Sequence, residues 1–341
     1  MKIACVCAAA GAWLATASLA SAVTVTDFAI YAQDDVRIRG TVTGDVGSHT
    51  DDVRVKKKTS VSGDVSAWDN VRIGRHSSVD GDVNAGGLIR RKRTSTVEGA
   101  LRPGLTDTDL ASVLASDLLP PHDFTAGGDS YNVKNHSLTL APGSYGSVAQ
   151  KGPADLYLKS GDYYFADLSG RQTHLMLDLS QGGVDLFVEG PMRLKKTSVF
   201  VKDAGGDYVP FDQADPDLAG LVYAEVHGRA KLKRSDWFGT IYTPYDLLTA
   251  RKVCVIGALY GGEDIRLRGE LSFVQYAPPG GDSPPDDGGD PAGDGGDGGN
   301  GDEPTGGPIA AVPEPTTLAL LCSGLLALAA GRRKWRVGRS T

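Results

Sequence analysis

Arginines recur in this chain at a regular step, and this spacing is the first indication of chemistry. Four of them, each preceded by a valine or an isoleucine, are Arg37, Arg54, Arg72 and Arg90. A row of stacked cations could hold an anionic polymer such as an acidic polysaccharide, with nucleic acid the less favoured partner. The alternative is an ordinary solvated face, with its charge balanced by Asp45, Asp64 and Asp82.

The acidic residues do not form a pattern that is typical of a catalytic site. Polysaccharide lyases and glycosidases need convergent carboxylates, or a basic residue beside a metal-binding acid cluster. The suggestive acids late in the chain are Asp236, Asp246, Glu263 and Asp264, and all four fall at expected turns. The 6 histidines are scattered, and no phosphate loop, nucleophile motif or zinc pattern occurs. We therefore predict a protein that is not an enzyme, with no catalytic residue, metal or cofactor, and keep a carbohydrate-active enzyme as the alternative.

The elements that must position the arginines follow from an internal repeat. "GDV" occurs at residues 44, 63 and 81, and Val71 follows Val53 by 18 residues. Apolar residues alternate within each copy, as at Val53 and Val55, which places them on one face of a strand. A fixed period with this alternation indicates short strands stacked as coils, which hydrogen-bond edge to edge about 4.8 Å apart.

The same step returns further along the chain. "LTLAPGSYGSV" and "LYLKSGDYYFA" begin 18 residues apart, and "EDIRLRG" near residue 265 echoes "DDVRIRG" near residue 36. We therefore predict an all-β protein, a right-handed β-solenoid with coils of about 18 residues in one or two lobes. The lobes would cover residues 23–104 and 124–277.

Between the lobes, "TDTDLASVLASDLLPP" has helical periodicity. The apolar residues on one face are Leu110, Val113, Leu114 and Leu118. Two prolines then end the pattern, so we predict a helical connector over residues 105–123.

The N-terminus has the pattern of a secretory signal peptide. Lys2 precedes an apolar stretch, and Ala20 and Ala22 form a small-residue cleavage site before Val23. This predicts a signal peptide over residues 1–22. Of the 4 cysteines, only Cys254 lies outside the apolar terminal segments, so we expect no internal disulfide and a buried Cys254 side chain.

The C-terminal region has the composition of a linker followed by an anchor. Residues 278–311 are rich in Gly, Asp and Pro and poor in aliphatic residues, a composition that predicts a disordered linker. Residues 316–331 are largely Leu and Ala, which predicts a transmembrane helix close to the minimum length. The basic cluster that follows is expected to stay in the cytoplasm.

The last segment, residues 312–341, resembles the PEP-CTERM sorting signal of Gram-negative bacteria. The resemblance rests on a Pro-Glu-Pro motif, a short apolar helix and a terminal basic cluster: Val312, Pro313, Glu314, Pro315, Arg332, Arg333, Lys334 and Arg336. It implies an exosortase-type membrane enzyme as a partner. It also implies export across the inner membrane, transient anchoring, and delivery to the cell surface or extracellular matrix.

The predicted first lobe resembles the bactofilins, which are polymer-forming β-helix proteins, in its "GDV" corners and its coil length. This resemblance covers residues 34–102 and implies that the solenoid could self-associate. The later "APGSY", "FGTIYTPYDLLTA" and "GALYGGEDIRLRG" segments resemble an uncharacterised β-helical domain of bacterial surface proteins. The second resemblance supports the fold and says little about function.

Taken together, these features predict an exported structural or adhesive protein of the cell surface or matrix that contacts anionic exopolysaccharide. Ice binding is a further alternative, because flat solenoid faces with regular threonine ladders bind ice. No Thr-x-Thr pattern repeats here at the coil spacing, which disfavours that function.

Overall fold

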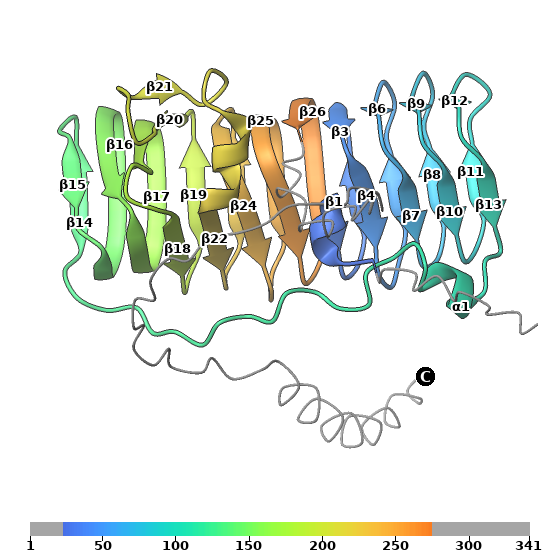
Figure 1. The fold of residues 1–341 in the computed structure, drawn as a ribbon, viewed down its shortest axis with the longest axis horizontal. Coiled ribbons are helices and arrows are strands. Elements are labelled where there is room, and N and C mark those ends of the chain that lie inside the picture. The colour runs from blue at the N-terminus through green and yellow to red at the C-terminus, as the bar shows by residue number, and fades with distance from the viewer. Residues whose placement is uncertain (1–22, 275–341) are drawn as a thin grey trace, which may run out of the picture. The chain divides into compact units, whose positions relative to one another are not determined.

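The computed structural model describes residues 23–274, with side chains described as far as residue 269. Its strands form one 26-stranded sheet that winds into the stacked coils of a solenoid (Figure 1). The predicted signal peptide, linker, sorting motif and apolar segment 316–331 lie outside the described residues. Within the described part, no helix is long and apolar enough to cross a membrane.

Residues 23–104, called the first half below, begin with a short 3-10 helix, η1 (Val25–Asp27), and continue as coils of three short strands each. The strands are β1 (Phe28–Ala32), β2 (Val36–Ile38), β3 (Thr41–Thr43), β4 (Asp45–Ser48), β5 (Val53–Val55), β6 (Ser60–Val61), β7 (Val65–Ala67), β8 (Val71–Ile73), β9 (Ser78–Val79), β10 (Val83–Ala85), β11 (Ile89–Arg91), β12 (Thr96–Val97) and β13 (Leu101–Pro103).

The alternating pattern of the sequence explains these coils. Val53 pairs with Val71 in parallel register, and both side chains are 0% exposed in the interior. Arg54 and Arg72 pair at the next position and lie at the surface. The 18-residue step and the inward position of the aliphatic residues are therefore confirmed in this half.

Residues 131–274, called the second half below, contain longer strands, several of which bend around a corner of the coil. They are β14 (Tyr131–Lys134), β15 (Leu138–Leu140), β16 (Gly143–Lys159), β17 (Gly161–Asp178), β18 (Val184–Val188), β19 (Met192–Lys195), β20 (Ser198–Lys202), β21 (Val209–Pro210), β22 (Val222–Val226), β23 (Ala230–Lys233), β24 (Asp236–Thr243), β25 (Leu248–Gly261) and β26 (Ile265–Val274).

Coil length varies in the second half. The buried hydroxyl of Thr173 faces that of Thr197, 24 residues later, and the Thr197 amide donates to Ser235, 38 residues later. In the longer of these two steps, the extra residues include β21 and the 3-10 helix η2 (Pro216–Leu221), which lie outside the regular coil. A strict repeat of 18 residues thus predicts the coil but not these insertions.

The two halves join into one solenoid at a seam between the last coil of the second half and the first coil of the first half. At this seam β1 pairs with β25, while β2 and β3 pair with β26, all in parallel. On its other edge, β1 pairs with β4. The described part of the chain therefore starts in the middle of the stack, builds outward to β13, and returns to complete the stack from its opposite end (Figure 1).

The predicted connector is mostly not helical. The helix α1 covers only Asp107–Leu110, where Thr106 and Asp109 form a reciprocal capping box. Residues 111–130, called the strap below, then run back along the solenoid to β14 (Figure 1). Tertiary contacts override the helical periodicity, because Leu114 is buried against the solenoid and the Ala115 carbonyl accepts a hydrogen bond from Tyr31.

Two apolar clusters hold this arrangement together. The larger one fills the interior of the coils in both halves. The smaller one lies between the strap and the outer face of the solenoid, and its buried members are Val25, Phe28, Tyr31, Leu110, Leu114, Ala115, Tyr242, Ala258 and Tyr260. The strap is thus a packed part of the fold.

The expectation of a buried Cys254 is wrong. Cys254 is exposed on β25, while its neighbours Val253 and Val255 are buried. Alternation along the strand places it outward, since the two valines occupy the inward positions.

Candidate polyanion-binding face

A column of basic side chains follows one outer side of the solenoid across the seam. Pairing of consecutive strands places its members next to one another. In spatial order the positions of this basic column are Arg193, Lys231, Thr249, Arg266, Arg37, Arg54, Arg72 and Arg90. Neighbouring coils lie about 4.8 Å apart, so the column presents a cation at nearly every step.

The four arginines chosen from the sequence therefore do stack in register, as expected. Sequence reasoning missed Arg266, which pairs with Arg37 across the seam. The signal for it was present, because "EDIRLRG" around Arg266 repeats "DDVRIRG" around Arg37. Arg193 and Lys231 carry no comparable signature, since 38 positions separate them from each other and the next member of the column, 18 positions after Lys231, is Thr249.

A row of aspartates at the start of the same strands orients part of this column. Asp35 binds Arg37 and lies 3.7 Å from Arg54, and Asp52 lies 2.9 Å from Arg54. Asp52 also lies 3.4 Å from Arg72. Burial opposes ionisation of Asp52, but hydrogen bonds from Asn70 and Arg54 outweigh this effect and hold its pKa below the ordinary value. The lowered pKa of Asp52 favours its charged form, and Asp35 and Asp52 together fix the guanidinium groups in place.

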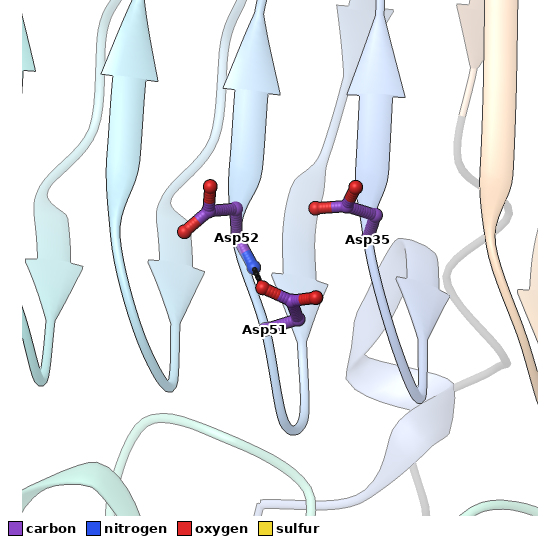
Figure 2. A group of neighbouring side chains, drawn as sticks. All are labelled: Asp35, Asp51 and Asp52. Carbon is purple, nitrogen blue, oxygen red and sulfur yellow. Dashed lines mark hydrogen bonds between the residues drawn. The ribbon is translucent and has the colours of Figure 1, made fainter. Parts of the chain in front are cut away.

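Figure 2 shows Asp35, Asp51 and Asp52 close together at this edge, with one carboxylate oxygen from each within 4.8 Å of the others. Such a cluster is also a pattern of metal ligands. Here the guanidinium groups of the basic column already neutralise Asp35 and Asp52, and the amide of Asp52 donates to Asp51 at 2.9 Å. We therefore interpret the cluster as the support of the basic column.

The aspartates at another corner do more than balance the charge of the arginines. Asp45 accepts a hydrogen bond from the backbone amide of Asp64, and Asp64 accepts one from that of Asp82, each at 2.7 Å. Asp82 accepts one from the Ala100 amide at 2.8 Å. These side chains hold consecutive coils together at a corner where Gly63 and Gly81 leave no room for a Cβ.

The four late acids that could have served catalysis do not share a site. Asp264 binds Arg266, Asp246 lies 3.6 Å from Arg229, and Glu263 is exposed. Asp236 lies at the start of β24, where burial raises the pKa of its carboxyl although a hydrogen bond from Ser198 opposes the shift. Lack of enzymatic activity stays a prediction.

Sequence reasoning also missed a buried acid beneath the strap. Glu225 on β22 is 0% exposed and accepts hydrogen bonds from both the amide (2.8 Å) and the ring Nδ1 (2.6 Å) of His122. Its oxygens also lie 2.8 Å from His227 Nε2 and 3.0 Å from the Tyr223 hydroxyl. His122 belongs to the strap, so Glu225 fastens the strap to the second half. Nothing in the sequence links residues 103 positions apart.

Comparison with known proteins supports the resemblances to the bactofilins and to the PEP-CTERM sorting signal. Residues 19–109 match the Bactofilin family, described as polymer-forming cytoskeletal. Residues 311–334 are a PEP-CTERM protein-sorting motif. This motif points to an exported protein at the cell envelope or surface and implies exosortase processing. No curated protein matches the chain.

Solved structures similar to this chain include three ice-binding proteins. One from the Antarctic ascomycete Antarctomyces psychrotrophicus is 16% identical with a TM-score of 0.32, over 74% of this chain and 96% of that chain. LeIBP from an Arctic yeast is 12% identical with a TM-score of 0.33, over 74% and 93%. A protein from an Antarctic biological consortium is 14% identical with a TM-score of 0.31, over 73% and 88%. Similarity at this level supports no conclusion about function.

Proposed function

We propose that this protein is an exported scaffold that binds acidic exopolysaccharide along its basic column and holds it at the cell surface or in the extracellular matrix. The observation that carries the proposal is the in-register column of cations that crosses both halves of the solenoid. A stack of coils keeps such side chains at a constant spacing without further support, which suits a repetitive polymer.

The partner is an acidic glycan because of where the protein goes and what the column offers. The sorting motif points to the envelope or surface, where an exported chain can meet exopolysaccharide. Arg72 has a side chain that is 47% exposed, and Arg90 is exposed as well. Exposed guanidinium groups can pair with carboxylate or sulfate groups in two-point geometry.

Reversing the charge of two column residues is expected to weaken binding of a long acidic polysaccharide about tenfold. This estimate assigns somewhat under 1 kcal/mol to each exposed ion contact, and about 1.4 kcal/mol corresponds to a factor of ten. The variant is Arg72→Glu with Arg90→Glu in the full chain, and affinity for alginate is measured at low and high salt. Because screening weakens exposed pairs, the difference should shrink at high salt.

The matched control is Arg102→Glu, which reverses an exposed arginine on β13, outside the basic column. Because the control changes the net charge by two units and the double variant by four, its loss of binding is compared with that of Arg90→Glu alone, and equal losses in these two single variants would show that only net charge matters. Release of shorter alginate products without stable binding would instead identify an enzyme and contradict the scaffold proposal.

Replacing Pro313, Glu314 and Pro315 with alanine is expected to block sorting and to leave the protein in the inner membrane. The expected result follows from the role of the motif in recognition by the processing enzyme. Cell fractionation with an antibody to the solenoid measures it, and a variant altered in the adjacent linker serves as the control. Unchanged surface delivery of the alanine variant would refute the sorting role.

A further inference from the structure

A basic groove of about 840 Å³ lies at the seam, beside the basic column. Its lining includes seven cationic residues and, among the described residues that form it, no acid. The cations are Arg39, Lys58, Lys231, Lys233, Arg251, Lys252 and Arg268. Arg39 and Lys58 come from the first half and the other five from the second half, so the groove exists only where the two halves meet.

A second column of cations leads into this groove, two residues beyond the basic column on each strand. Strand pairing orders it as Arg171, Lys195, Lys233, Arg251 and Arg268. Within the described residues, none of these five has a carboxylate within 4 Å, in contrast to Arg37 and Arg54. The nearby charges of Arg171 and Lys233 lower the pKa of Lys195, as mutual repulsion requires.

The corner beside the groove carries cations in an unfavourable backbone conformation. Lys58 and Lys252 have φ values of 58° and 53°, in the left-handed region that favours glycine. Gly269, with a φ of 96°, occupies the equivalent corner of the next coil and packs against Lys252. The same left-handed φ recurs at the corresponding corners of other coils, at His76, Asn135, Gln172, Lys196 and Arg234, so it belongs to the corner of the coil and does not by itself indicate a ligand.

We propose that the seam groove is a discrete binding site for a short linear oligoanion, such as a run of uronate or sulfated sugar units within an acidic glycan. The inference builds on the proposed scaffold function and adds a specific location, stoichiometry and ligand length. The occupant is linear because the cations come from five consecutive coils, which together extend roughly 19 Å along the stack. It carries several charges because a single anion could not reach Lys233, Arg251 and Arg268 together with Arg39 and Lys58.

A ligand in the seam groove contacts both halves of the solenoid, whereas a ligand bound on the basic column away from the seam contacts only one of them. An oligoanion that contacts Arg39 and Lys58 together with Lys233 and Arg251 bridges the two halves. It also relieves repulsion among cations that folding brings together. Such a ligand binds the joined solenoid and not the separated halves, so it stabilises the fold by an amount that grows with the logarithm of its concentration above the Kd.

The test uses the full chain purified in mild detergent, with three hexasaccharides: oligogalacturonate, a fully sulfated oligomer, and neutral maltohexaose. Calorimetric titration at low salt is expected to show one bound acidic hexamer per chain, with no binding of maltohexaose. The bound hexamer should also raise the unfolding temperature. The ratio of the two acidic affinities shows whether sulfate or carboxylate is preferred.

The groove variant is Lys233→Gln with Arg251→Gln, and the matched control is Arg91→Gln with Arg102→Gln, which removes the same charge at the far end of the first half, outside the basic column. Hexamer affinity should fall at least tenfold in the groove variant and less than twofold in the control. Equal affinities in the two variants, or many hexamers bound per chain, would overturn the seam site. If long alginate still binds while the hexamer does not, the seam site fails and the scaffold proposal stands. If the hexamer binds and long alginate does not, the seam site stands and the scaffold proposal fails.

Discussion

Replacing Glu225 with alanine is expected to destabilise the protein by roughly 3 kcal/mol and to release the strap. The fully buried carboxylate accepts four hydrogen bonds, two of them from His122 of the strap. A hydrogen bond to a charged group contributes about 1.5–3 kcal/mol, and the cost of burying the carboxylate offsets part of the sum. Urea unfolding measures the loss, and hydrogen exchange over residues 111–130 measures release of the strap.

The control for this variant is Glu189→Ala. Glu189 is exposed and accepts a single hydrogen bond from the strap, from the Ala126 amide at 3.3 Å. Its loss should cost less than about 0.5 kcal/mol, as for other exposed contacts. Similar destabilisation by both variants would mean that Glu225 does not fasten the strap, and unchanged exchange in the strap would mean the same.

Much of the first half follows from sequence reasoning, because its coils repeat with little variation. Val53 and Val71 stack inside as the 18-residue step requires, and Arg54 and Arg72 stack outside at the next position. Local alternation and a fixed period are sufficient for this, since each coil pairs only with its neighbours.

The seam could not be predicted in the same way. Pairing of Arg37 with Arg266 depends on which coil edge meets which, and a repeat that is similar throughout does not specify that order. The strap decides it, since it carries the chain from β13 back along the stack to β14 (Figure 1). The seam groove and the Glu225 cluster both combine residues distant in sequence, so neither leaves a local motif.

The helix predicted for the connector fails for a related reason, because contacts with residues distant in sequence override the local periodicity. Leu110 and Leu114 do share an apolar environment, as their spacing suggests, but the environment is the outer face of the solenoid. Tyr31 and Tyr242 then bind the carbonyls of Ala115 and Leu119, which an α-helix would need for its own hydrogen bonds. Side-chain donors from distant coils thus favour an extended strap over the helix that periodicity predicts.

Replacing Gly257 with alanine is expected to destabilise the protein by about 4 kcal/mol, a large loss for the addition of one methyl group. Gly257 has a φ of 140°, and a Cβ on it would lie 2.0 Å from the backbone oxygen of Gly239 on the neighbouring coil. Backbone strain and overpacking each cost about 1–3 kcal/mol, and neither can be relieved by rotating a side chain.

The strand pairing around Gly257 prevents the backbone from moving to relieve this destabilisation. Gly239 and Gly257 pair in register between β24 and β25, and β25 in turn pairs with β1 at the seam. Moving β25 away from β24 would therefore disturb the junction of the two halves as well as one coil. Urea unfolding measures the effect, with Gly127→Ala as the control, because a Cβ at Gly127 meets no atom within 4 Å. If Gly257→Ala were as stable as Gly127→Ala, β24 and β25 would not approach as closely as this stack of coils requires.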